Sequence, residues 1–160
     1  MIDYENMRRA VVTGLKDYLK CPVIRSNQTG EPPAYPYCSY TITTLMSQNN
    51  GTYGEYADGM QTKPFKQIWS ITVQSENDSE SVELTVKARE WFDNVGTTFL
   101  SDCNVIVESV GGVTNRDNII TINYEYRKGF DVTFWLLDVI KDTTTETIDD
   151  MELGIAEQKG

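Results

Sequence analysis

The spacing of apolar residues alternates along this chain between a helical period and a two-residue period, and this alternation limits the folds open to it. Over residues 2–19 the apolar side chains recur every three or four positions, at Tyr4, Met7, Val11, Leu15 and Tyr18. That period predicts an amphipathic helix packed on a sheet. The helix should end before Pro22, because the residue that precedes a proline avoids the helical region.

A second helix is predicted to follow residues 76–79 (ENDS), whose side chains can cap its first turn. The apolar stripe of this helix consists of Leu84, Ala88, Trp91 and Val95. The stripe should face the core, and Gly96 is the expected stop. Bulky aromatic residues at this spacing are typical of a core rather than of a cofactor site.

Segments with two-residue alternation stand between and after the helices. Those predicted as strands are residues 23–24, 37–44, 65–75, 105–107, 118–126 and 130–140. We expect residues 65–75 to pair with 37–44, and residues 127–129 to form a turn or bulge. The order of helix, three strands, helix and three strands predicts an α+β fold in which two helices pack on a mainly antiparallel sheet.

The length of 160 residues fits one domain, which we place at residues 1–140. Residues 45–64 contain three glycines and few aliphatic side chains, so we predict a long hairpin loop there. Residues 141–160 form an acidic C-terminal tail. This tail is either a flexible, solvating segment or a segment that docks on a neighbouring subunit, and its apolar residues would serve the second role.

The chain contains no histidine, the side chain most often used for acid-base work near neutral pH. Its absence excludes Ser-His-Asp catalysis and histidine-rich metal sites. The cysteines Cys21, Cys38 and Cys103 are odd in number and lack CxxC spacing, which indicates buried free thiols rather than disulfides or a zinc site. No common catalytic motif is present. We therefore expect neither an enzyme nor a bound cofactor.

The net charge of -10 argues against a surface that grips nucleic acid, because such surfaces need clustered Lys and Arg. An acidic surface can still lie beside DNA without binding it. No stretch is apolar enough for a membrane span, and the first residues lack the order of a signal peptide. We expect a protein made and kept in the cytoplasm.

Proline and tyrosine are concentrated in residues 27–37 (NQTGEPPAYPY). The prolines favour an extended, polyproline-like course. One interpretation is a rigid connector whose tyrosines cover the end of the core. The other is a contact between subunits, since tyrosine offers a large contact area at a small entropy cost. The residues leave both interpretations open.

Three stretches carry a family resemblance: NQTGEPPAYPYCSYTI, QIWSITVQSENDSESVELTVKAREWF and GVTNRDNIITINYEYRKGFDVTFWLLD. Together, from about Leu15 to Asp138, they resemble the neck or tail terminator proteins of long-tailed bacteriophages. The resemblance implies the α+β fold of that family and a ring, usually of six subunits. Such a ring caps the tail tube, ends its polymerisation and docks to the head connector.

The partners implied by the resemblance are further copies of the chain, the tail tube protein and the head-tail connector protein, with DNA passing through the ring without specific binding. The implied location is the neck of the virion, after assembly in the cytoplasm of the host bacterium. Two other functions stay open. One is another head-tail joining or tail-completion protein, and the other is a small-ligand binding module that uses the tyrosine-rich loop as a pocket.

The resemblance and the proline-rich stretch together give eight candidate contact residues. They are Asn27, Gln28, Pro33, Tyr35, Tyr37, Arg116, Asp117 and Arg127. Arg116 and Arg127 are notable because basic residues are scarce. Pairing with acids across the ring is one role for them, and a surface salt bridge worth about 0–1 kcal/mol is the other.

Overall fold

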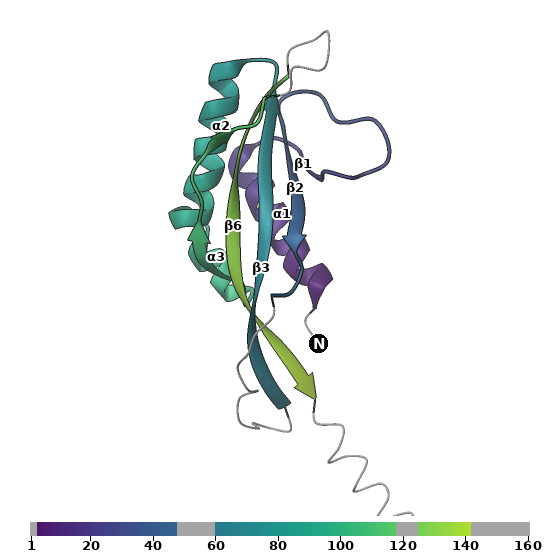
Figure 1. The fold of residues 1–160 in the computed structure, drawn as a ribbon, viewed down its shortest axis with the longest axis vertical. Coiled ribbons are helices and arrows are strands. Elements are labelled where there is room, and N and C mark those ends of the chain that lie inside the picture. Colours follow the sequence, from purple (N-terminus) through teal and green to yellow (C-terminus); the bar gives the residue numbers. More distant parts are fainter. Residues whose placement is uncertain (1–2, 48–59, 118–124, 142–160) are drawn as a thin grey trace, which may run out of the picture.

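The computed structural model describes residues 3–47, 60–117 and 125–141, and it contains one layer of helices on one face of a sheet (Figure 1). The elements in chain order are α1 (Tyr4–Leu19), β1 (Val23–Arg25), β2 (Tyr37–Thr44), β3 (Met60–Ser75), α2 (Asp78–Glu90), the π-helical turn η1 (Trp91–Val95), α3 (Thr97–Asp102), β4 (Ile106–Val110), β5 (Thr114–Asn115) and β6 (Tyr126–Lys141). This order confirms the predicted α+β fold.

The strands form one sheet in the order β1-β2-β3-β6-β4, with β5 paired to β6. Only β1 and β2 run parallel, and all other pairs are antiparallel, including the predicted pair of β2 and β3. The pairing of β3 with β6 is the longest, and it runs without interruption from Met60↔Lys141 to Ser75↔Tyr126. These two strands therefore form the axis of the molecule.

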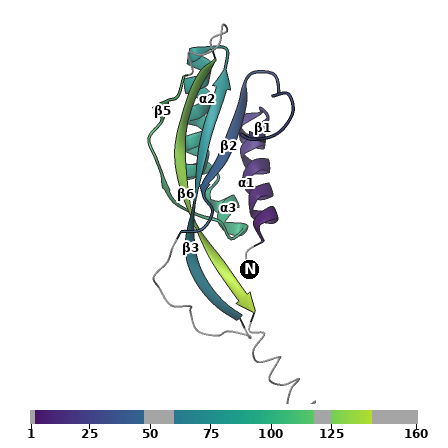
Figure 2. The ribbon, with the colours of Figure 1, turned by 45° about the vertical axis from the view of Figure 1, so that its right-hand side comes forward.

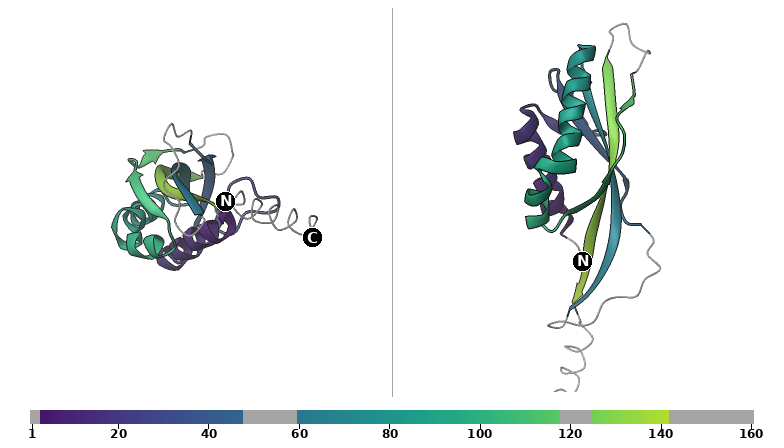
Figure 3. Two further views of the ribbon diagram at one scale, coloured as in Figure 1. Left: turned by 90° about the horizontal axis from the view of Figure 1, so that it is seen from below. Right: turned by 90° about the vertical axis from the view of Figure 1, so that its left-hand side faces the viewer.

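The described helices all cover one face of the sheet, and none of them lies on the other face (Figure 3). The odd-numbered residues of β3 from Phe65 to Ser75 and the even-numbered residues of β6 from Lys128 to Leu136 are buried and face the helices. The buried apolar residues of these strands are Phe65, Trp69, Ile71, Val73, Phe130, Val132, Phe134 and Leu136. Trp69 lies at the centre, stacked on Tyr40 with ring centroids 4.8 Å apart and edge-on to Phe134 at 5.7 Å.

Helix α1 is fixed at both ends by its own residues. The side chain of Asp3 accepts a hydrogen bond from the backbone N–H of Asn6, and Lys20 ends the helix in the left-handed conformation. The buried positions are Met7, Val11, Leu15 and Leu19. Tyr4 and Tyr18, which we expected on the same stripe, are only half-buried.

The second helical region differs from the prediction at its C-terminal end. After α2, the chain continues through the π-helical turn and a short helix, α3, so Gly96 is not a stop. A π-helical turn contains an extra residue, which rotates the residues that follow it. Val95 is accordingly 51% exposed instead of facing the core. The prediction also missed the buried Ser81 and Thr85, whose hydroxyls donate to helix carbonyls three and four residues back.

The predicted turn at residues 127–129 is wrong, because β6 runs straight through it. Gly129 has another purpose there. A side chain at this position would overlap the carbonyl oxygen of Ile71 and would come within 2.6 Å of the guanidinium of Arg116. The strand predicted at residues 118–126 lies outside the described residues up to position 124.

Strand β3 begins at Met60, whereas we expected the strand to begin at Phe65. The strand includes Pro64, which lacks an N–H. Lys66 exchanges hydrogen bonds with Ser47 on the side of β3 that faces away from β6. Pro64 faces the same side two residues earlier, so its missing N–H interrupts no hydrogen bond between β3 and β6. Beyond the ends of β2 and β4, these two strands continue as a ribbon that extends from the body (Figure 2).

Two further expectations concern cysteines and membranes. Cys21 and Cys38 are buried free thiols as predicted, but Cys103 is exposed, because it follows the last turn of α3 at the surface. Among the described residues, none of the helices combines the length and the apolarity that a membrane crossing requires.

Candidate functional site

Residues 26–36, which we call the arm, connect β1 to β2 and project sideways from the body (Figure 1). At the start of the arm, the N–H and the hydroxyl of Ser26 both donate to the carbonyl of Tyr40, each at 2.9 Å. At its end, the N–H of Cys38 donates to the carbonyl of Pro22 at 2.8 Å. Most residues between these points are exposed. The arm is therefore held firmly at its root and stands in solvent along its length.

The two tyrosines at the end of the arm stack on each other, but only one is buried. Their ring centroids are 5.5 Å apart, with 23° between the planes. Tyr37 is 6% exposed, whereas Tyr35 is 40% exposed. Burial and the carboxylate of Glu125 raise the pKa of both phenols. Tyr37 thus covers the end of the core, while Tyr35 presents one side of its ring to solvent.

A pocket of about 570 Å³ lies between the arm and the helix-free face of the sheet. Its lining includes four of the eight candidate residues, namely Gln28, Pro33, Tyr37 and Arg127. The floor is polar and is organised by Gln74. With its amide oriented to satisfy its neighbours, Gln74 donates to the carbonyls of Tyr37 (3.2 Å) and Thr72 (3.1 Å) and accepts from the hydroxyl of Ser39 (2.7 Å).

Asp117 joins the chain before β6 to the start of that strand. Its Oδ1 accepts from the N–H of Arg127 at 2.7 Å and from Nζ of Lys128 at 2.6 Å. Lys128 also pairs with Asp78 at 2.9 Å, and its side chain is only 8% exposed. Burial acts to raise the pKa of Asp117, but the hydrogen bonds from Lys128 and Arg127 outweigh it and lower that pKa.

The same balance holds for Lys128. Burial acts to lower its pKa, but the hydrogen bonds to Asp117 and Asp78 outweigh burial and raise it. A buried ammonium group needs such partners, because removing a charge from water without pairing it is costly. The three side chains therefore form one charge cluster that ties the start of α2 to β6.

Arg116 lies on the helix-free face of the sheet and bridges β3 and β6. Its guanidinium donates to the hydroxyls of Ser70 (2.7 Å) and Thr72 (2.9 Å) and pairs with Asp131 at 3.3 Å. Arg127 pairs with Glu125 at 3.5 Å. Both arginines thus have partners within their own subunit, and a contact with a neighbouring subunit stays a prediction.

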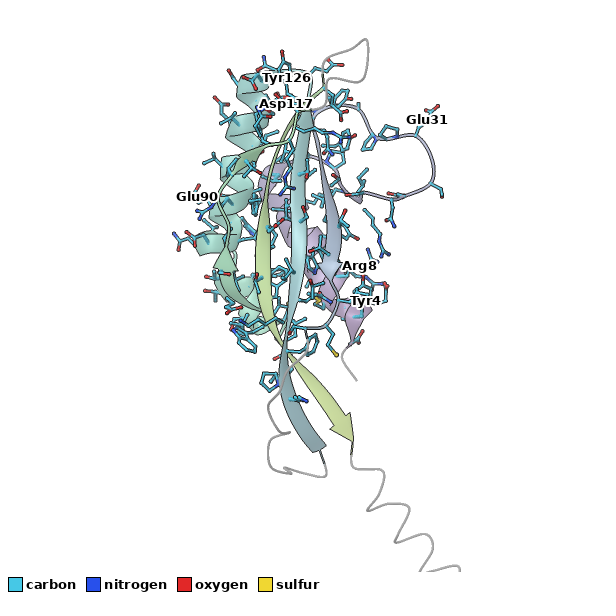
Figure 4. All side chains as sticks on the ribbon, viewed as in Figure 1. Tyr4, Arg8, Glu31, Glu90, Asp117 and Tyr126 are labelled. Carbon is cyan, nitrogen blue, oxygen red and sulfur yellow. The ribbon has the colours of Figure 1, made fainter. Side chains whose placement is uncertain are left out.

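The structure brings seven of the eight candidate residues into one group at one end of the molecule. Tyr35 joins the pocket residues by stacking on Tyr37, and Asp117 and Arg116 join through backbone bonds with Arg127. Asn27 is exposed on the arm and does not line the pocket. Figure 4 shows Asp117 and Tyr126 at this end, with Glu31 on the arm beside them.

Sequence reasoning missed Gln74, Ser39 and Lys128. Gln74 and Ser39 occupy the polar side of alternating strands, which predicts exposure, and only the arm above them makes them buried. Lys128 stood in a segment predicted as a turn. The structure places it in β6, opposite Val73 of β3.

The arrangement leaves an exposed arm and a polar pocket that a partner could contact. Within the described ranges, no group of Cys, Asp and Glu side chains is placed to hold a metal ion. Arg116, Asp117, Arg127 and Lys128 are engaged in ion pairs and hydrogen bonds within the subunit. What remains available to a partner is the exposed surface of the arm and the pocket beneath it.

The family whose model matches the chain, over residues 9–160, is described as phage neck terminator protein. No curated protein matches the chain. One solved structure, of a protein without a functional name, is similar over 84% of this chain and 96% of its own, with 15% identity and a TM-score of 0.47. At that level, the similarity carries no argument about function.

Proposed function

The chain belongs to the family of phage neck terminator proteins, and from this premise we propose that its copies form a ring that caps the tail tube and ends its polymerisation. The family assigns the chain a structural role in joining phage head and tail, and a place in the virion. The ring, its six subunits and its docking to the head connector are the finer parts of the proposal. They come from the resemblance described above.

The observation that carries the proposal is the arm. It has a fixed root, three prolines and an exposed tyrosine, and it projects sideways from the body. A segment that is already ordered loses little conformational entropy when a partner binds. An arm of this kind is suited to a permanent contact in an assembly.

The ribbon of β3 and β6 supports the proposal from the other end of the molecule. Residues 60–64 and 137–141 pair with each other beyond the ends of β2 and β4. A two-stranded ribbon is at best marginally stable by itself in water. We therefore assign the ribbon to contacts along the axis of the tail, with the tube or with the connector, and the arm to contacts around the ring.

The acidic character of the chain fits a channel through which DNA passes. With a net charge of -10, the subunit offers few cations to neutralise phosphates. Like charges repel at short range and are screened beyond a Debye length of about 8 Å. DNA would thus move through the ring without specific binding.

The proposal is tested by the mass of the purified protein and by the length of tail tubes. Light scattering over a wide concentration range, with negative-stain images, should show rings of about six subunits. If the free protein is monomeric, it should still bind one end of purified tail tubes and stop their growth when tube protein is added. Tubes that grow to the same length with and without the protein would contradict the proposal.

The pocket of about 570 Å³ beneath the arm favours a second candidate, a small-ligand binding module. Its volume lies within the usual range for ligand pockets, about 300–1,000 Å³. A monomer whose melting temperature rises with a particular small molecule, and which has no effect on tubes, would support this candidate. Another head-tail joining role would instead appear as binding to the connector without an effect on tube length.

A further inference from the structure

The outer side of α2 carries an apolar strip that nothing in the described structure covers. Val82 is 40% exposed and Val86, one turn later, is 50% exposed. Arg89 lies on the same side of the helix, and its guanidinium donates to the carbonyls of Val110 (3.2 Å), the last residue of β4, and Gly111 (2.8 Å), which follows it. The strip therefore faces outward at the β4 edge of the sheet.

The arm projects from the opposite edge. Strands β1 and β4 are the two ends of the strand order, and the arm follows β1 directly. Figures 1 and 4 show the arm with Glu31 on one side of the molecule and α2 with Glu90 on the other.

Arm and strip also lie at the same level along the molecule. Tyr37, at the end of the arm, pairs with Gln74, and α2 begins only four residues after Gln74. In a head-to-tail ring, the projecting segment of one copy meets the opposite edge of the next copy at the same height along the ring axis. The arm and the apolar strip are placed in this way.

We propose that the arm of one copy packs on Val82 and Val86 of the next copy, with Arg25 at the root of the arm beside Glu83. This inference rests on the proposed ring and names the surfaces that close it. The two surfaces differ and lie on opposite edges, so the contact is heterologous and can repeat around a ring. A two-fold dimer would instead need both surfaces within one self-complementary patch.

The chemistry of the two surfaces is complementary. The arm offers the exposed apolar groups of Pro32, Ala34 and Tyr35, which match the valine strip in character. Residues 3–25, on the arm side, carry five bases and three acids, whereas residues 78–102 carry six acids and two bases. Of these bases, Arg8 pairs with Glu5 at 2.9 Å, and the exposed Arg25 stands directly before the arm. Opposite charge on the two edges favours a second copy of this chain as the occupant.

Cross-linking between differently labelled copies tests the contact. In a Cys103→Ser background, which leaves only the buried Cys21 and Cys38, one preparation carries Ala34→Cys and the other Val86→Cys. Mixed assemblies, in solution or on tail tubes, should give disulfide-linked dimers under mild oxidation, and neither preparation alone should. Val95→Cys replaces Val86→Cys as the control, because Val95 is equally exposed at 51% but lies outside the strip.

A charge exchange supplies a second measurement that does not depend on a disulfide. Arg25→Glu and Glu83→Arg should each weaken association about tenfold, and the double variant should recover most of the loss. Arg25 and Glu83 are both exposed, so folding should be unaffected.

The outcomes separate this inference from the proposed function. The contact between arm and α2 is overturned if rings or capped tubes form but the Ala34–Val86 cross-link does not, and the double variant shows no recovery. The proposed ring is then unaffected. If the wild-type chain assembles neither in solution nor on tubes, the proposed function fails and this inference fails with it.

Discussion

The guanidinium of Arg116 lies across the backbone of Gly129, in the space that a side chain would otherwise fill. From there it reaches Ser70 and Thr72 on β3 and Asp131 on β6. Gly129 itself pairs with Thr72 and with Thr114 of β5. A single cation thus connects three strands on the face of the sheet that has no helix.

Replacing Gly129 by alanine should destabilise the protein by about 1–3 kcal/mol, the range for overpacking a close contact. The new Cβ would meet the carbonyl of Ile71, which is backbone and cannot move aside easily. Urea unfolding followed by circular dichroism measures the change. Gly112→Ala is the control, because a Cβ at Gly112 meets nothing within 4 Å, and its stability should change little. Equal effects for the two variants would contradict this explanation.

The charge cluster should make stability depend on pH at both extremes. Asp117 has a lowered pKa, so its contribution is present above the ordinary Asp value of about 3.9 and is lost as the pH falls through the folded value. Lys128 has a raised pKa, so its contribution is present below about 10.4 and is lost as the pH rises through the folded value.

Asp117→Asn should therefore cost about 1–3 kcal/mol at pH 7 and reduce the loss of stability on acidification below about pH 4. Urea unfolding at a series of pH values tests both effects. Asp131→Asn is the control, because Asp131 is 60% exposed and its pair with Arg116 should be worth at most about 1 kcal/mol. An unchanged acid profile in Asp117→Asn would show that the cluster does not contribute.

Tyr35 in the arm and Tyr37 at the start of β2 should respond differently to replacement by serine. Tyr35→Ser removes an exposed ring, so the monomer should unfold at nearly the same urea concentration while assembly weakens. Tyr37→Ser removes a buried ring and should lower stability by about 3 kcal/mol or more. Circular dichroism and light scattering on the same samples separate the effects. If Tyr35→Ser unfolds the monomer, the arm serves to cover the core and not to contact another subunit.

Of the three thiols, Cys103 alone should react quickly with a thiol reagent in the folded protein, because the other two are buried. Burial raises the pKa of Cys21 and of Cys38, which lowers the fraction of reactive thiolate further. Absorbance during reaction with a chromogenic disulfide should show one fast thiol in the wild type and none in Cys103→Ser. Two or more fast thiols in the wild type would contradict the burial of Cys21 or Cys38.

Deletion of residues 143–160 should leave the thermal stability of the subunit nearly unchanged. Among the residues that the structure describes, the buried apolar ones all precede position 137, so the deletion removes none of these. A melting curve measured by circular dichroism tests this. If the tail docks on a neighbouring subunit, the same variant should fold normally but assemble less well. A collapse of the melting temperature would show instead that the tail belongs to the domain.

The sequence predicted the elements whose apolar spacing is regular. Helix α1, the pair of β2 and β3, and the buried face of β3 followed directly from the periods of their residues. The error at residues 127–129 occurred because the residue type there is set by packing with distant residues and not by local conformation. Gly129 was interpreted as a turn residue, but it is small because Arg116 needs the space, and that demand comes from residues far away in the chain.

The candidate site was predictable as a segment but not as a cluster. The arm could be predicted because its prolines and tyrosines give the segment an unusual composition and a stiff backbone. Gln74 and Lys128 became buried only because the arm and α2 lie over them, and such burial leaves no local pattern. The π-helical turn at Trp91–Val95 likewise has no signal in the spacing, and it moved Val95 from the core to the surface.

The parallel pairing of β1 with β2 has a consequence for evolution of the arm. Arg25 ends β1 opposite Tyr40, so a connection to Tyr37 has to run back only about 10 Å along the sheet. Its eleven residues have a contour length of about 35–40 Å. The arm is therefore much longer than the distance it has to span, and insertions or deletions in it leave the strand register unchanged. The reach of the subunit toward its surroundings and the architecture of its sheet can thus vary independently of each other.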